Sequence, residues 1–226
     1  MRKLSSILWQ IDIPIQHAST MQSLHVDLGG GLEPRNPFGA SDIICVDLVS
    51  PFDRSDLKFI TFDVSRNFPI ETNSVSSFSA YDLIEHIPRW ERYDEEIVFP
   101  FINFMNEIFR CLEPGGVFLA VTPAYPAKEV FQDPTHVNYI TIDTAKYFEK
   151  LSTNGHGYGI NTRFKIIFND WLKGPGPYLK ESLATELASA NILRKFIILL
   201  KYAKRTLYVL RRRQKSHILW ILQKPV

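Results

Sequence analysis

The chain has 226 residues, of which 45% are hydrophobic, and this is enough to bury one sizeable core. No run of about eighteen uninterrupted apolar residues occurs, which excludes a membrane-spanning helix. The formal net charge of +2 conceals a basic segment near the C-terminus. The two cysteines, Cys45 and Cys111, exclude a disulfide framework and a cysteine metal cluster, so we expect both in the core of a cytoplasmic protein.

Strands and helices alternate along the sequence, as a parallel α/β sheet requires. Short apolar runs predict strands at 24–28, 43–48, 59–63, 75–80, 117–121, 164–168 and 217–222. Helical spacing of apolar residues predicts a long helix at 95–112, stopped by Glu113-Pro114-Gly115-Gly116, and a short helix near 143–151. The strand at 75–80 is unusually polar, which leaves its register open. We predict a single domain over residues 1–226, with an N-terminal extension at 1–22 that lacks the cleavage site of a signal peptide.

A basic segment at 192–215 belongs to a helical insertion that we predict at 175–215. Nine of the 26 basic residues and none of the 24 acidic residues lie between 193 and 215. One helical face is apolar (Ile192, Phe196, Leu199, Leu200, Ala203, Leu207, Leu210) and the opposite face is basic (Arg194, Lys201, Arg205, Arg212). Such a helix lies on an anionic membrane, here the inner face, or packs its apolar face on the sheet or a second subunit. We do not expect nucleic acid as a partner, because the rest of the chain lacks a basic groove.

A glycine-rich turn follows the first predicted strand in the run Val26-Asp27-Leu28-Gly29-Gly30-Gly31, and Asp47 ends the second strand. Glycines allow a ligand to approach the backbone, and a carboxylate at this distance accepts hydrogen bonds from ribose hydroxyls. The D-x-G-x-G spacing lacks the third glycine of a dinucleotide site, which disfavours a nicotinamide-dependent oxidoreductase. Acidic residues on both sides of the glycines (Asp27 and Glu33) suit a cationic ligand such as S-adenosylmethionine. The alternative is a turn with a structural role only.

Four blocks of sequence carry a family resemblance. In chain order they are Asp27-Leu28-Gly29-Gly30-Gly31 with Pro34-Arg35-Asn36-Pro37-Phe38 and Asp47; Asp63 with Phe68-Pro69 and Asn73-Ser74-Val75; Ala80-Tyr81-Asp82-Leu83-Ile84-Glu85-His86-Ile87-Pro88; and Glu107-Ile108-Phe109-Arg110-Cys111-Leu112-Glu113-Pro114-Gly115-Gly116. Together they resemble the class I S-adenosylmethionine-dependent methyltransferases. Two later stretches, Thr122-Pro123-Ala124-Tyr125-Pro126 and Phe131-Gln132-Asp133-Pro134-Thr135-His136-Val137-Asn138, look like a subgroup associated with bacterial glycan and surface-polysaccharide modification.

The resemblance implies a Rossmann-like fold and a set of cofactor contacts. The sheet would have seven mostly parallel strands with the last antiparallel and helices on both faces, a cofactor-binding core at 24–170, and the last strand at 216–226. The residues implied to bind S-adenosyl-L-methionine are Asp27, Gly29, Gly30 and Gly31 at the methionine half, Asp47 and Leu48 at the ribose, Asp63 and Val64 at the adenine, and Ala80 and Tyr81 near the methyl group. This chain departs from the family in having Gly30 where the family often has cysteine, and we expect the fold to tolerate glycine there.

Methyl transfer to oxygen needs a group that removes a proton, and a histidine suits this role. His136 lies in the loop after the fifth predicted strand, at the edge where open α/β sheets bind ligands. We predict that His136 is the base and Asp133 orients its ring, with Tyr125 as a further acceptor contact; the alternative is a plain turn. We expect His86 to pack or cap near the cofactor wall and His25 to be a core or edge residue. Asp133 and His136 alone are too few ligands, so we predict no metal.

The sequence therefore predicts methyl transfer from S-adenosylmethionine to an oxygen of a small-molecule, glycan or lipid-linked sugar acceptor. The alternative is a methyltransferase-like binding or scaffold protein that keeps the cofactor pocket and has lost turnover.

Overall fold

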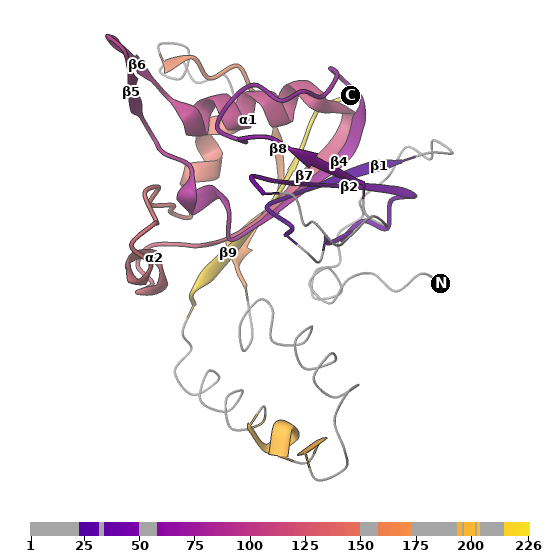
Figure 1. The fold of residues 1–226 in the computed structure, drawn as a ribbon, viewed down its shortest axis with the longest axis vertical. Coiled ribbons are helices and arrows are strands. Elements are labelled where there is room, and N and C mark those ends of the chain that lie inside the picture. The colour runs from indigo at the N-terminus through magenta and orange to yellow at the C-terminus, as the bar shows by residue number, and fades with distance from the viewer. Residues whose placement is uncertain are drawn as a thin grey trace.

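A seven-stranded sheet organises the chain (Figure 1). The structure, a computed structural model, describes residues 23–31, 34–49, 58–149, 158–172, 194–195, 197–201, 203 and 215–226. The strand order is β3-β2-β1-β4-β7-β9-β8. The strands are β1 (Leu24–Leu28), β2 (Asp42–Asp47), β3 (Phe59–Thr61), β4 (Val75–Tyr81), β7 (Leu112–Pro123), β8 (Lys165–Trp171) and β9 (His217–Gln223). All seven predicted strands are therefore present, with shifted ends.

The strand directions confirm the predicted mostly parallel sheet. Strands β3, β2, β1, β4 and β7 pair in parallel, and β9 runs antiparallel to both of its neighbours, β7 and β8. The register of β9 joins Val117 to Gln223 and Pro123 to His217. Alternate residues of β9 pack into the cores on the two faces of the sheet, so residues 218–222 are all buried, which accounts for the continuous apolar run in this part of the sequence.

The long helix α1 (Pro100–Cys111) begins later than the sequence predicts. Residues 91–98 form an antiparallel pair of short strands instead, β5 (Glu91–Tyr93) and β6 (Glu96–Val98). The predicted start at residue 95 is wrong because a residue before proline disfavours helical backbone, so the helix starts only at Pro100 itself. Most of the apolar face predicted for this helix is buried in the large core, including Phe101, Phe104, Met105 and Ile108, whereas Ile97 lies in β6 and is exposed.

Three short helical turns complete the described elements that surround the sheet. They are η2 (Ile84–His86), α2 (Glu129–Gln132) and η3 (Thr144–Phe148), and η3 is the short helix predicted near 143–151.

The sheet has a large core on the side of α1 and a smaller one on its opposite face. The smaller core contains Tyr81, Leu119, Val121, Leu219 and Ile221. Phe38 packs against it from the connection between β1 and β2. In the described part of that connection, residues 29–31 and 34–41, the backbone forms no helix. Phe38 therefore covers part of the smaller core, on a face of the sheet that a crossover helix usually covers.

The polar strand β4 is buried along its whole length, and its serines bond to β1. The register pairs His25 with Ser77 and Asp27 with Ser79. Ser79 Oγ donates to Asp27 Oδ1 at 2.5 Å, so it accepts from His25 Nε2 at 2.9 Å. His25 Nδ1 then accepts from Ser77 Oγ at 2.8 Å. Burial lowers the pKa of His25 to about 4, so the ring is neutral in this network.

We expect Ser79→Ala to lower the free energy of unfolding by about 1–3 kcal/mol, because it removes one partner each from the buried Asp27 carboxylate and the His25 ring. Ser74→Ala is the matched control, since its hydroxyl bonds to the Glu71 carbonyl at an exposed position and its loss should cost about 0.5 kcal/mol or less. Urea denaturation of both variants measures the difference. Equal midpoints for the two variants would contradict a stabilising network between β1 and β4.

Candidate functional site

A tight turn follows β1 and places backbone amides at the carboxyl edge of the sheet. Gly29 and Gly31 have φ angles of 69° and 54°, which side chains rarely allow. The Gly29 amide donates to the Val46 carbonyl at 2.7 Å, and the Gly31 amide donates to Asp47 Oδ2 at 3.2 Å. The turn after β1 and the carboxylate that ends β2, which the sequence predicts to cooperate, are therefore in direct contact.

Asp27 lies beneath this turn and is completely buried. Its Oδ1 accepts from Ser79 Oγ, and its Oδ2 accepts from the Arg35 amide at 2.7 Å. Burial raises the pKa of Asp27 to about 6, against the lowering effect of these two hydrogen bonds. Since its side chain is completely buried and both oxygens bond to the protein, Asp27 shapes the turn.

Gly30 is the one glycine of the turn that packing requires. A Cβ added there would lie 2.4 Å from Asp27 Oδ2 and 3.0 Å from Cys45 Sγ. Both neighbours are held in place, since Asp27 is bonded on both oxygens and Cys45 is buried in β2. Glycine is therefore the residue that fits at this position, because any Cβ needs space that the Asp27 carboxylate already fills.

Asp47 and Leu48 extend the edge beyond the turn. Asp47 Oδ1 accepts from the Leu48 amide at 2.7 Å, and the Asp47 carboxylate is partly exposed. Each carboxylate oxygen has a second lone pair, so Asp47 retains the capacity to accept from a ligand. The Leu48 side chain is 65% exposed and offers an apolar surface beside it.

Asp63 and Val64 follow β3, one strand further along the same edge. Asp63 Oδ1 accepts from the Ser65 amide at 2.9 Å, and its other oxygen lies 3.8 Å from Arg66 Nε. Val64 packs against the large core. This arrangement positions Asp63 by a local turn and leaves its carboxylate partly exposed.

Ala80 and Tyr81 end β4 on opposite faces of the sheet. Ala80 belongs to the large core and Tyr81 to the small one, and both are buried. The Arg35 guanidinium lies over the Tyr81 ring, 4.3 Å from its centroid. Together with the glycine turn, Ala80, Tyr81 and Arg35 lie around the carboxyl ends of β1 and β4.

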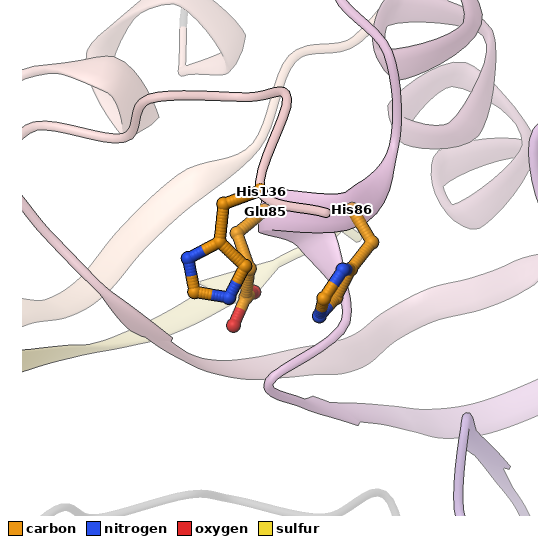
Figure 2. A group of neighbouring side chains, drawn as sticks. All are labelled: Glu85, His86 and His136. Carbon is orange, nitrogen blue, oxygen red and sulfur yellow. The ribbon is translucent and has the colours of Figure 1, made fainter. Parts of the chain in front are cut away.

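Glu85, His86 and His136 meet at the carboxyl ends of β4 and β7 (Figure 2). One nitrogen of each ring and a carboxylate oxygen of Glu85 all lie within 4.8 Å of one another. The two rings meet edge to face with centroids 4.8 Å apart. Glu85 is buried, and the two histidines are partly exposed. Sequence reasoning missed this group, because His136 lies far along the chain from the other two.

Backbone hydrogen bonds hold the loop of His136 against η2. The amides of Val137 and Asn138 both donate to the Glu85 carbonyl at 2.9 Å. Asn138 Nδ2 donates to the Ile84 carbonyl at 3.0 Å, and Arg89 Nε donates to Asn138 Oδ1 at 2.8 Å. The Asn138 amide and the Arg89 guanidinium therefore hold the loop of His136 against a segment about fifty positions earlier in the chain.

The predicted pair of Asp133 and His136 has a different geometry from the one expected. Asp133 Oδ1 accepts from the amide and the hydroxyl of Thr135, at 2.8 and 2.7 Å. These bonds lower the pKa of Asp133. The His136 ring is instead oriented by the Val130 carbonyl, which lies 3.0 Å from Nδ1. Tyr125 is 56% exposed on the chain segment after β7.

No protein-family model matches the sequence, and no curated protein matches it. Solved structures match the fold. An S-adenosylmethionine-dependent methyltransferase from Archaeoglobus fulgidus aligns with a TM-score of 0.51 and 15% identity over 90% of this chain and 86% of that chain. A chain of the complex between the Haloferax volcanii Trm112 methyltransferase activator and a protein assigned as a methyltransferase gives a TM-score of 0.50 and 16% identity, over 95% of this chain and 86% of that chain. At these identities the likeness establishes the Rossmann-like methyltransferase fold alone.

We expect Gly30→Ala to destabilise the protein by about 1–3 kcal/mol, because its Cβ displaces the buried Asp27 carboxylate. Gly39→Asn is the control: a Cβ at Gly39 meets nothing within 4 Å, and asparagine tolerates its φ of 67°. Thermal melts of both variants measure the cost. A melting temperature for Gly30→Ala equal to wild type would show that the turn has room for a side chain.

Proposed function

We propose that this protein transfers a methyl group from S-adenosyl-L-methionine. The observation that supports it is the bond between the glycine turn after β1 and Asp47 at the end of β2. Open α/β sheets bind ligands outside the carboxyl ends of their strands, and the turn, Asp47 and Asp63 all lie there. The glycine turn suits the methionine half, Asp47 suits the ribose hydroxyls, and Asp63 with Val64 suits the adenine.

Transfer from a sulfonium is an in-line displacement in which the leaving group is already activated. The protein therefore has to orient the acceptor and, for an oxygen acceptor, remove its proton. His136 suits this step because Nδ1 donates to the Val130 carbonyl, which leaves the lone pair of Nε2 available. That lone pair has two chemically distinct uses: it accepts a proton, or it binds a metal ion.

The acceptor that we propose is an oxygen of a small molecule or of a glycan or lipid-linked sugar. The support comes from the two stretches at 122–126 and 131–138 that resemble glycan-associated methyltransferases, both of which follow β7 at the cofactor edge. The exposed Tyr125 hydroxyl offers a hydrogen bond to such an acceptor. The alternative function is a binding or scaffold protein with the same pocket and no turnover.

Calorimetric titration with S-adenosylmethionine and S-adenosylhomocysteine tests the cofactor. We expect micromolar binding of both and none of NAD, with at least a tenfold loss in Asp47→Ala, because the ribose hydroxyls lose their acceptor. Ser74→Ala serves as the control variant that should bind normally. No binding by wild type would contradict the proposal, and binding without turnover across an acceptor screen of nucleotide- and lipid-linked sugars would favour the scaffold alternative.

For the basic segment we propose peripheral contact with the anionic inner face of the membrane. Most of 192–215 lies outside the described residues. In the described part, the apolar side chains of Ile197, Leu199 and Leu200 are 45%, 48% and 55% exposed, so they are not buried on the sheet. Arg194 and Lys195 are exposed as well. Within the described residues, no helix is long and apolar enough to cross a membrane.

We expect the protein to co-sediment with anionic liposomes and to lose most of this binding when Arg211, Arg212 and Arg213 become glutamine. The physical reason is that each cation near the surface contributes about 1 kcal/mol. A triple change of Lys58, Lys128 and Lys146 to glutamine removes the same charge from exposed positions elsewhere and should bind normally. Equal loss in both triple variants would show a general charge effect, against a specific role of the segment.

A further inference from the structure

The group of Glu85, His86 and His136 has the composition of a metal site. Two imidazoles with one carboxylate suit first-row divalent transition metals, whereas magnesium and calcium prefer oxygen ligands alone. Ligands of a tetrahedral ion with bonds of about 2.1 Å are separated by about 3.4 Å. The donors of this group already lie within 4.8 Å of one another, so shifts on the order of 1 Å would bring them onto one ion. Figure 2 shows the Glu85 carboxylate beside the two rings.

Both histidines have their second nitrogen bonded to the protein in the way that metal ligands require. His136 Nδ1 donates to the Val130 carbonyl at 3.0 Å. His86 Nδ1 lies 3.0 Å from Thr135 Oγ1, which itself donates to Asp133 Oδ1, so the histidine is the donor. Each Nε2 consequently carries a lone pair. A backbone carbonyl or a carboxylate-linked group behind a histidine fixes its tautomer and orientation for a metal.

The Glu85 carboxylate has an unused oxygen at the same place. Its Oε2 accepts from Thr122 Oγ1 at 2.9 Å. Its Oε1 is buried and has no hydrogen-bond partner among the described residues. The residue is only 1% exposed, so water does not supply that partner freely. An unpaired buried carboxylate oxygen is costly and calls for a partner.

We propose that Glu85, His86 and His136 bind one divalent transition-metal ion at the carboxyl edge of the sheet. The sequence prediction of no metal considered Asp133 and His136 alone, and the structure supplies a different set of three. Asp133 belongs behind the site, where it orients His86 through Thr135.

The role of the ion rests on the proposed methyl transfer. Three protein ligands leave coordination positions open for oxygens of an acceptor, and a bound metal lowers the pKa of a hydroxyl that it holds. The ion occupies the Nε2 lone pair of His136, so His136 serves as a ligand and not as the base. The two roles predict opposite responses to a chelator.

Metal binding is measured on the full chain after chelator treatment and dialysis. Titration with Co²⁺, followed by visible absorption, and with Zn²⁺, followed by calorimetry, should give one equivalent in wild type. His86→Ala and Glu85→Gln should each weaken binding at least tenfold. Glu85→Gln keeps an acceptor for Thr122, and thermal melts verify that both variants fold. His217→Asn is the control, because His217 contacts Asp82 and Ser216 and should leave the affinity unchanged.

Three results would overturn the metal site: no binding by wild type, unchanged affinity in His86→Ala and Glu85→Gln, or equal loss in His217→Asn. The S-adenosylmethionine titration of the metal-free protein separates this proposal from the function. Cofactor binding without metal binding removes the metal site alone and returns His136 to the role of base. Metal binding without cofactor binding removes the methyl-transfer proposal alone.

Discussion

The contact between β1 and β4 holds the candidate site together, because the buried carboxylate of Asp27 needs partners that only β4 and the turn supply. Ser79 occupies one oxygen and the Arg35 amide the other. The same carboxylate fills the space beside Gly30, so the turn after β1 has no room for a side chain at this position. A polar network in the middle of an otherwise apolar sheet thus sets the shape of the turn that is proposed to hold the cofactor.

Parallel strands then bring two separate groups to one edge. The glycine turn, Asp47 and Asp63 follow β1, β2 and β3, and form the side that suits a nucleoside. Glu85, His86 and His136 follow β4 and β7, and form the side that we propose binds a metal ion. Since β1 and β4 are neighbours in the sheet, the two sides are adjacent. This adjacency is what a transfer between two bound molecules requires.

The second side depends on tertiary contacts of the loop after β7. The Glu85 carbonyl accepts two amides of that loop, and Arg89 holds Asn138 in place. Arg89 also donates to the Tyr139 carbonyl. These bonds are made by η2 and the residue stretch after it, so the segment that carries Glu85 and His86 also positions His136.

The sequence by itself determined the strands, the sheet class and the meeting of the glycine turn with Asp47. Apolar runs and the spacing of Gly29, Gly31 and Asp47 are local patterns, and parallel pairing alone brings their ends together. Only the tertiary structure decided the space around Gly30 and the grouping of Glu85 with His136. These depend on a buried carboxylate and on hydrogen bonds between residues about fifty positions apart, neither of which leaves a periodic pattern in the sequence. The serines of β4 are unusual for a buried strand when the sequence is read alone. Their hydrogen-bond partners in β1 explain them, and only the sheet pairing brings those partners together.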